Sequence, residues 1–229
     1  MGPIPLSGPP VNLAYYPFTG NSLASFDTDP LSTASSLSGT GLGTLSFNTT
    51  YGVPAPSLSL EAGSIPSSFL ASSYLSFTIT PNPGYVLNLN SFSFQVSRIF
   101  NGSYTVNYEV RSSVDNFTTA VLSGSNSSAT APTFDPVSTS LGPSFVNLAS
   151  VEFRLYLWDS NNGANNRLLL DNITVTGNAV VIPEPSSLAV AVALGLAGLG
   201  AARASAGGAR LRRARHLRSP RPGGPVPAR

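Results

Sequence analysis

Alternation of apolar and polar residues is the feature of this chain that most constrains its fold. Four runs between residues 74 and 176 place apolar side chains at every second position: Tyr74–Thr80, Asn90–Ser97, Tyr104–Arg111 and Val151–Trp158. A period of two is the period of a β-strand, whose successive side chains point to opposite faces. Each run therefore predicts a strand with one buried face and one solvent face.

Shorter segments extend this pattern over most of residues 1–178. Further strands are expected at Leu42–Asn48, Ser57–Glu61, Phe117–Leu122 and Arg167–Thr176. No stretch of this body keeps a helical period for more than two turns. Short strands with one polar face predict an all-β fold, an antiparallel two-sheet, jelly-roll-like β-sandwich. Uneven strand lengths favour this arrangement over a closed barrel.

Segments without alternation predict the connections. Residues 1–14 are rich in proline and glycine and are expected to be a lead-in, and Ser123–Pro143 is expected to be a loop-rich crossing. Asn101-Gly102 is a typical two-residue turn and predicts a β-hairpin between the strands on either side.

The body is poorly supplied with catalytic side chains. The chain has no cysteine and no lysine, and its one histidine, His216, lies in the C-terminal tail. These absences exclude disulfides, a Ser-His-Asp triad in the body and Schiff-base chemistry. Glu109 and Glu152 lie beside Arg111 and Arg154 on polar strand faces, which predicts cross-strand ion pairs. We therefore expect no enzymatic activity, and a glycosidase using the two glutamates ranks third among the alternatives.

Asp171 occupies an unusual position in the predicted last strand. By parity it shares a face with Leu169 and Ile173, which should be the buried face. A buried carboxylate has to be satisfied by a bulge, by hydrogen bonds or by a cation. The first hypothesis is a bulge or backbone hydrogen bonds. The second is a structural calcium ion shared with Asp27 or Asp29, and no other cofactor is expected.

Two aromatic residues are candidates for ligand binding. Tyr156 and Trp158 alternate onto the polar face of their strand, where they could stack on a sugar ring, whereas Tyr108 falls on the core face of its own strand. The segment Leu170-Asp171-Asn172-Ile173-Thr174-Val175 also loosely resembles the last strand of non-catalytic carbohydrate-binding sandwiches. That resemblance implies a polysaccharide partner.

The charge of the chain is divided between its two ends. Residues 1–182 carry four arginines and nine carboxylates, a net charge of −5, while residues 183–229 carry eight arginines and one glutamate, a net charge of +7. The sequence pI of about 9.2 is therefore a property of the tail. We expect no nucleic-acid partner, because the basic residues follow a membrane-length apolar run and are not spread over a folded domain.

A proline-flanked glutamate separates the body from this tail. Residues 179–187 form an extended segment around Pro183, Glu184 and Pro185, because the two prolines fix φ and prevent regular pairing. The uncharged run 188–202 follows and predicts a short transmembrane helix of roughly 22 Å, less than the roughly 20 residues of a comfortable span. Its apolar anchors include Leu188, Leu194, Leu196 and Leu199.

A basic cluster ends the chain. Residues 203–229 read as a disordered, arginine-rich tail, and the positive-inside rule places its first arginines in the cytoplasm. These arginines are Arg203, Arg210, Arg212, Arg213 and Arg215. Residues Met1–Leu6 show no basic start and no apolar stretch, so no secretory signal is visible in this sequence.

The order of these three features resembles the PEP-CTERM sorting signal, over about residues 181–215. The resemblance implies recognition of Pro183, Glu184 and Pro185 by an exosortase, a membrane protease. It also implies a passing inner-membrane anchor and a final place at the cell surface of a Gram-negative bacterium that makes exopolysaccharide. The leading hypothesis is therefore an exported extracellular-matrix protein with a structural or adhesive sandwich. The alternative is a carbohydrate-binding module acting on exopolysaccharide.

Overall fold

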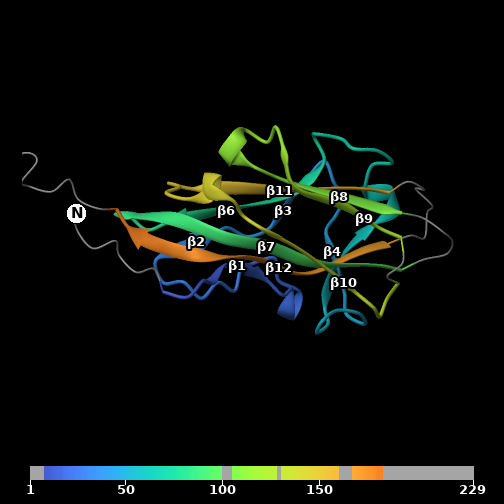
Figure 1. Ribbon diagram of the computed structural model, residues 1–229. Helices are drawn as coiled ribbons and strands as arrows, with labels where there is room; N and C mark the ends of the chain where they lie inside the picture. The colour runs from blue at the N-terminus through green and yellow to red at the C-terminus, as the bar shows by residue number, and fades with distance from the viewer. Residues whose placement is uncertain (1–7, 100–104, 128–129, 160–166, 183–229) are drawn as a thin grey trace, which may run out of the picture. The chain divides into compact units, whose positions relative to one another are not determined.

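The structure is a computed structural model that describes residues 8–99, 105–127, 130–159 and 167–182 (Figure 1). These residues form two antiparallel sheets of six strands each, and no α-helix occurs among them. Figure 1 shows the sheets as two layers, with β8 and β11 in one and β7 and β12 in the other. The prediction of an antiparallel β-sandwich is confirmed.

Sheet A is built around the last strand of the described chain. Its order is β10-β7-β12-β5-β4, and β1 pairs with β12 beyond the end of β5. The strands are β1 (Val11–Tyr16), β4 (Ser46–Asn48), β5 (Ser57–Glu61), β7 (Tyr85–Ile99), β10 (Asp135–Ser140) and β12 (Arg167–Val181). β7 and β12 pair from one end to the other, so they form the centre of the sheet.

Sheet B has the order β2-β6-β11-β8-β9, and β3 pairs with β6 beside β2. Its strands are β2 (Ser32–Ala34), β3 (Ser38–Thr40), β6 (Tyr74–Pro81), β8 (Val106–Ser112), β9 (Ala120–Asn126) and β11 (Val151–Asp159). Four short 3₁₀ turns complete the description: η1 (Thr19–Asn21), η2 (Ala62–Ser64), η3 (Ser113–Asp115) and η4 (Pro143–Phe145). The last two lie at the same end of the sandwich, where β8 and β10 finish.

The eight strands from β5 to β12 pair in a nested way. β5 pairs with β12, β6 with β11, β7 with β10, and β8 with β9. Such a chain is one long hairpin rolled into two sheets, which is the jelly-roll pattern. β1 to β4 extend the edges of this roll.

Aromatic rings from both sheets fill the space between the layers. Phe77 of β6 and Phe153 of β11 meet Phe92 of β7, with ring centroids 6.3 and 5.2 Å from that of Phe92. These side chains are the alternate apolar positions of the predicted strands, and they are buried. Each buried aromatic ring contributes on the order of 2–3 kcal/mol through the area removed from water. Alternation therefore sets which face of each strand enters the core.

A β-bulge in β12 changes the parity of that strand. Between the pairs Asp171↔Gln95 and Thr174↔Ser93, β12 has one residue more than β7, and Asn172 adopts a left-handed φ of 49°. The extra residue moves Ile173 onto the core face, while Asp171 points away from it. The prediction that Leu169, Asp171 and Ile173 share one face is therefore wrong.

Three predicted connections differ from the structure. The hairpin at Asn101-Gly102 is wrong, because β7 and β8 on either side belong to different sheets; the two residues themselves lie outside the described residues. The segment Ser123–Pro143 contains the end of β9 and all of β10. The proposed lead-in 1–14 includes the start of β1, with Leu13 buried in the core. Local turn chemistry does not specify which sheet a strand joins.

The described body ends at Ile182. β12 continues to Val181, beyond the predicted boundary at residue 178, and the Ile182 amide donates a hydrogen bond to the Gly84 carbonyl at 2.9 Å. The predicted sorting motif, the transmembrane segment 188–202 and the arginine cluster lie outside the described residues. Within the described residues, we find no helix with the length and apolar character needed to cross a membrane.

Candidate functional site

The outer face of sheet B carries large side chains on three adjacent strands. In the strand register, Tyr156 of β11 lies between Tyr74 of β6 and Glu109 of β8, and Arg154 lies opposite Arg111. These residues occupy the positions that alternate with the core residues of each strand. The fold therefore gathers rings and charges from β6, β8 and β11 on one surface.

Four rings on this surface form a continuous cluster, which we call the aromatic strip: Phe69, Tyr74, Tyr156 and Trp158. Phe69, from the loop before β6, lies 5.2 Å from Tyr156 and 5.7 Å from Trp158, measured between ring centroids. Tyr74 lies 5.5 Å from Tyr156 in an edge-to-face arrangement. These separations are those of favourable aromatic pairs.

Two guanidinium groups cover parts of the strip. The Arg111 Cζ lies 4.7 Å from the ring centroid of Phe69 and 5.7 Å from that of Tyr156. The Arg154 Cζ lies 4.4 Å from the ring centroid of Tyr74 and 3.6 Å from that of Phe117. Each contact of this kind contributes on the order of 0.5–1 kcal/mol at an exposed site. The arginines therefore hold the rings in defined positions.

Each arginine is paired with a glutamate of its own strand. The Arg111 Nε donates a hydrogen bond to Glu109 Oε1, and the Arg154 Nε donates to Glu152 Oε1 at 2.7 Å. The predicted pairing of these four residues is right, but the prediction that the pairs cross between strands is wrong. Arg111 and Arg154 are the direct cross-strand neighbours, so the glutamates offset repulsion between two like charges.

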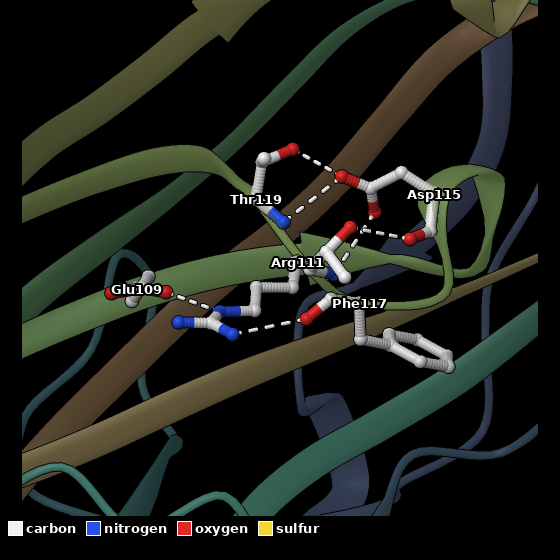
Figure 2. A network of polar contacts seen from close by, with 6 residues as sticks. Glu109, Arg111, Asp115, Phe117 and Thr119 are labelled. Atoms are coloured by element: carbon white, nitrogen blue, oxygen red, sulfur yellow. Dashed lines mark hydrogen bonds and ion pairs between the residues drawn. The ribbon is translucent and has the colours of Figure 1, made fainter.

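The loop after β8 positions the ring of Phe117 (Figure 2). The Arg111 Nη1 donates a hydrogen bond to the Phe117 carbonyl at 3.0 Å, and Asn116 and Phe117 both adopt left-handed backbone angles. A left-handed bulky residue is uncommon and has to be held by its surroundings. β9 begins at Ala120, after this turn, and not at residue 117 as predicted.

Asp115 holds the same loop from the other side. Its carboxylate accepts hydrogen bonds from the Thr118 amide at 3.3 Å, the Thr119 amide at 2.9 Å and the Thr119 hydroxyl (Figure 2). The hydrogen bond from the Thr119 side chain is the largest of the effects that lower the pKa of Asp115. The ionised carboxylate therefore stabilises the turn that contains Phe117.

The strip is partly open to solvent. Phe69 is 36% exposed, the adjacent Leu70 is 49% exposed, and Trp158 is half-buried. Tyr156 is 3% exposed because Phe69 and Arg111 cover it. A ligand would thus contact Phe69 and Trp158 before Tyr156, which Phe69 and Arg111 cover.

The two predicted ligand residues, Tyr156 and Trp158, are brought together through Phe69, which contacts both rings. Tyr108 faces the core, as predicted. The sequence does not single out Phe69, because it lies in a loop where no periodic signal marks it. It does not single out Phe117 either, because the pattern predicts a strand there, whereas Phe117 lies in a left-handed turn before β9. Tyr74 could have been found, since it shares the parity of the polar positions of β6.

Asp171 is satisfied without a cation. Its carboxylate accepts hydrogen bonds from the amides of Val53 and Asn172, at the bulge of β12. Burial raises the pKa of Asp171 to about 6, and the two hydrogen bonds oppose that rise. The first hypothesis for this residue, a bulge with backbone hydrogen bonds, is confirmed.

The calcium hypothesis finds no support in the part of the chain that the structure describes. Asp29 accepts hydrogen bonds from the Leu31 amide at 3.1 Å and the Ser32 hydroxyl at 2.8 Å, and Asp27 accepts one from the Ala34 amide at 3.3 Å. The described residues contain no group of three histidine, cysteine or acidic residues that could hold a metal ion. The fold does not bring Asp27, Asp29 and Asp171 together as ligands.

Comparisons with known proteins give similarities of fold only. No protein-family model matches the chain. No curated protein matches it either. A search of solved structures finds several carbohydrate-binding modules.

Three of them show the level of similarity. The xylan-binding CBM22-1 domain of Xyn10C from Paenibacillus barcinonensis is 12% identical, with 75% of this chain and 96% of that chain covered and a TM-score of 0.43. The C-terminal family 22 module of Xyn10B from Clostridium thermocellum is 15% identical, with 76% and 100% covered and a TM-score of 0.41. TmCBM61, in complex with β-1,4-galactotriose, is 9% identical, with 73% and 99% covered and a TM-score of 0.42. At these identities and TM-scores no family or ligand is assigned, so function has to be inferred from the chain's own residues.

Proposed function

We propose that the β-sandwich is a non-catalytic carbohydrate-binding module and that polysaccharide binds over the aromatic strip. The observation that carries this proposal is the cluster of Phe69, Tyr74, Tyr156 and Trp158 on an outer sheet face, with Arg111 and Arg154 beside it. An outer face needs no such rings for folding, because polar residues suffice on the solvent side of an antiparallel sheet. Rings at this surface expose apolar area to water, which is unfavourable, and exposed apolar patches of this kind indicate a binding role.

The chemistry of the strip suits a neutral sugar chain. A pyranose ring has apolar C–H faces, which pack on aromatic rings, and a rim of hydroxyl groups, which bond to charged side chains. Glu109 and Glu152 are each held by an arginine two residues further along the strand. These glutamates are therefore suited to accepting hydrogen bonds at the rim of a ligand. The proposal assigns them no catalytic role.

Retention on insoluble polysaccharides tests this function. The full chain should be retained on at least one neutral polysaccharide, and Trp158→Ala and Phe69→Ala should each weaken retention. Phe26→Ala is a matched control, because Phe26 is 48% exposed and its amide bonds to Tyr15 of β1, in sheet A. Absence of retention on a broad panel, or equal loss for all three variants, would overturn the proposal.

We further propose that the protein is exported and processed at its tail. The support is the order Pro183-Glu184-Pro185, uncharged run 188–202 and arginine cluster, which resembles the PEP-CTERM signal. β12 ends immediately before this motif in the sequence, so a processing enzyme would meet a proline-flanked segment directly after the folded body. In this proposal run 188–202 is a short transmembrane helix, an exosortase is the partner, and the cell surface is the destination.

Mass spectrometry of the mature protein from an exosortase-bearing host tests the processing step. A C-terminus near residues 183–185 is expected, with Arg203 and all later residues removed. Glu184→Ala should leave the tail attached, while Ser187→Ala should be processed normally. Mature wild-type protein that retains Arg203 would contradict the proposal.

A structural or adhesive sandwich is the competing function for the same exported protein. The exposed pair Phe69 and Leu70 would then contact another protein and not a sugar. The two functions differ in their ligand, so the retention experiment separates them: a sandwich that binds protein partners alone should show no affinity for any polysaccharide.

A further inference from the structure

A pocket of about 430 Å³ lies at one end of the sandwich, away from the rings of the aromatic strip. It is formed where β8 gives way to η3 and β9 in sheet B, and where β10 gives way to η4 from sheet A. The residues that the inference uses are Ser112, Asp115, Thr119, Ser140, Leu141 and Phe145. Its volume is within the range of small-molecule sites.

The two sides of the pocket offer different chemistry. Leu141 and Phe145 belong to the hydrophobic core and present apolar surface, and the Phe145 ring is held by stacking on Phe153, with centroids 6.0 Å apart and planes 6° from parallel. Hydroxyl groups of Ser112, Thr119 and Ser140 supply the polar lining. A ligand that fits both has an apolar face and a rim of hydroxyl groups.

Ser112 contributes to the lining a hydroxyl group that the fold does not use. Ser112 is 1% exposed and shares the inward face of β8 with Tyr108 and Val110, which precede it at every second position. Its carbonyl accepts a hydrogen bond from the Phe117 amide, but its hydroxyl makes no hydrogen bond within the described residues. The Ser112 hydroxyl is not among the buried side-chain atoms that lack a partner in the described residues, so it remains accessible within the pocket. It is therefore free to donate a hydrogen bond to, or accept one from, a ligand hydroxyl.

The charge of the pocket narrows the class of ligand. Asp115 is part of the lining, and the hydrogen bonds from Thr118 and Thr119 keep its carboxylate ionised. Among the described lining residues no arginine or other cation balances this charge. Anionic ligands, such as uronic acids or phosphorylated sugars, are therefore disfavoured.

We propose that this pocket binds one uncharged sugar residue of hexose size, as a site separate from the aromatic strip. The strip is an open surface suited to several units of a chain, whereas the pocket has the volume for one unit at the end of the sandwich. The loop 113–119 borders both, since Phe117 lies against Arg154 of the outer face while Asp115 and Thr119 line the pocket. The inference goes beyond the proposed function, because it adds a second site with its own specificity.

Backbone NMR of the full chain during titration with small ligands tests the proposal. Methyl β-glucopyranoside, methyl β-galactopyranoside and N-acetylglucosamine are the neutral probes, sodium glucuronate is the anionic probe and 1-hexanol the apolar one. At least one neutral sugar should shift the amides of Val121, Leu141 and Phe145, and glucuronate should not. The proposal is overturned if no neutral sugar shifts these amides, or if hexanol alone does.

Substitutions separate this site from the strip. Ser112→Ala removes this hydroxyl and leaves the rest of the lining in place, and it should weaken sugar binding about tenfold, as expected for one lost hydrogen bond. Ser144→Trp, at an exposed position of the pocket lining, should block the pocket without altering the core. Trp158→Ala should leave pocket titration unchanged. Loss of pocket binding in Trp158→Ala would show a single site on the strip. If the pocket binds sugar but the protein is not retained on any polysaccharide, the function proposed for the strip is overturned and the pocket proposal stands.

Discussion

The two outer faces of the sandwich are made from the same strand pattern and yet differ in chemistry. On sheet A, Ser91 lies opposite Thr176 with their hydroxyl oxygens 2.7 Å apart, and Ser93 lies opposite Thr174. On sheet B, the corresponding positions hold Tyr74, Tyr156, Trp158 and two arginines. The inner faces of both sheets contribute apolar residues to the core. The demands of the core therefore do not explain the rings on sheet B.

The contrast shows which side chains on the outer faces are not required for folding. Short hydroxyl side chains satisfy one another on sheet A and present little apolar area. Sheet B presents exposed Phe69 and Leu70 and keeps Phe117 in a left-handed conformation, two features that cost stability. Such costs are common at functional sites.

The largest expected effect is on ligand binding. Phe69→Ala combined with Trp158→Ala should reduce polysaccharide affinity by roughly 100-fold, because each ring supplies buried apolar area and stacking. Ser93→Ala combined with Thr174→Ala, on sheet A, should leave affinity within twofold. Depletion assays with a soluble form of the retained polysaccharide give both values. If both double variants lost the same affinity for polysaccharide, the outer face of sheet B would have no special role in binding.

The second effect is a pH dependence that arises on sheet A. The folded pKa of Asp171, about 6, lies above its unfolded value, so the folded state holds the proton more tightly. The free energy of unfolding should therefore fall as pH rises from about 4 to about 6. After a discount for solvent screening, the loss is on the order of 1–2 kcal/mol.

Denaturant unfolding at several pH values measures this dependence, with Asp171→Asn as the comparison. The variant should lose most of the slope between pH 4 and 6. Asp27 gives a residual slope of the same sign, because burial raises its pKa as well. A wild-type protein whose stability rises over that interval would refute the assignment.

A third prediction compares one arginine from each sheet. Arg154→Met should destabilise the fold by about 1 kcal/mol, because it removes the contacts with Tyr74 and Phe117. Arg167→Met, in sheet A, removes an exposed ion pair with Glu61 at 3.1 Å and should cost less than about 0.5 kcal/mol. Chemical denaturation of both variants gives the difference. An equal cost would mean that the stacked rings add nothing to stability.

The smallest effect is expected for the glutamates of the outer face. Glu152→Gln leaves a hydrogen-bond acceptor for Arg154 and should change stability by less than about 0.5 kcal/mol. It should nevertheless reduce sugar affinity severalfold if the carboxylate accepts a sugar hydroxyl. Parallel melting curves and depletion assays distinguish the two. A large loss of stability would assign Glu152 to the fold rather than to the proposed ligand.

Much of the fold could be predicted from the sequence, because β6, β8 and β11 and most of β7 have a period of two with one apolar face. β5 was predicted with its observed bounds, and β6 and β11 to within one residue at each end. β10 was missed because it lies at a sheet edge, carries Pro136 and buries Val137 as its one core residue. The strand was therefore indistinguishable from a loop.

The candidate site was predictable only in part. Trp158 and Tyr156 lie on the solvent parity of a clear strand, so the pattern alone brought them to attention. Phe69 joins them from a loop, and its place depends on the packing of that loop against Arg111. The fate of Asp171 depended on a bulge of one residue, which the alternation itself conceals. Tertiary contacts between distant segments decided each of these points.

The place of β12 has a mechanical consequence. This strand pairs with β7 along its length, and from Arg167 to Gly177 it also pairs with β5 or β1 on the other side. A pulling force applied at Ile182 in the direction of the strand axis would load many of these hydrogen bonds at once in shear. Extracting β12 would require them to fail together, whereas an edge strand could be peeled away bond by bond. A domain tethered at this end is thus built to resist being pulled open from its own C-terminal side.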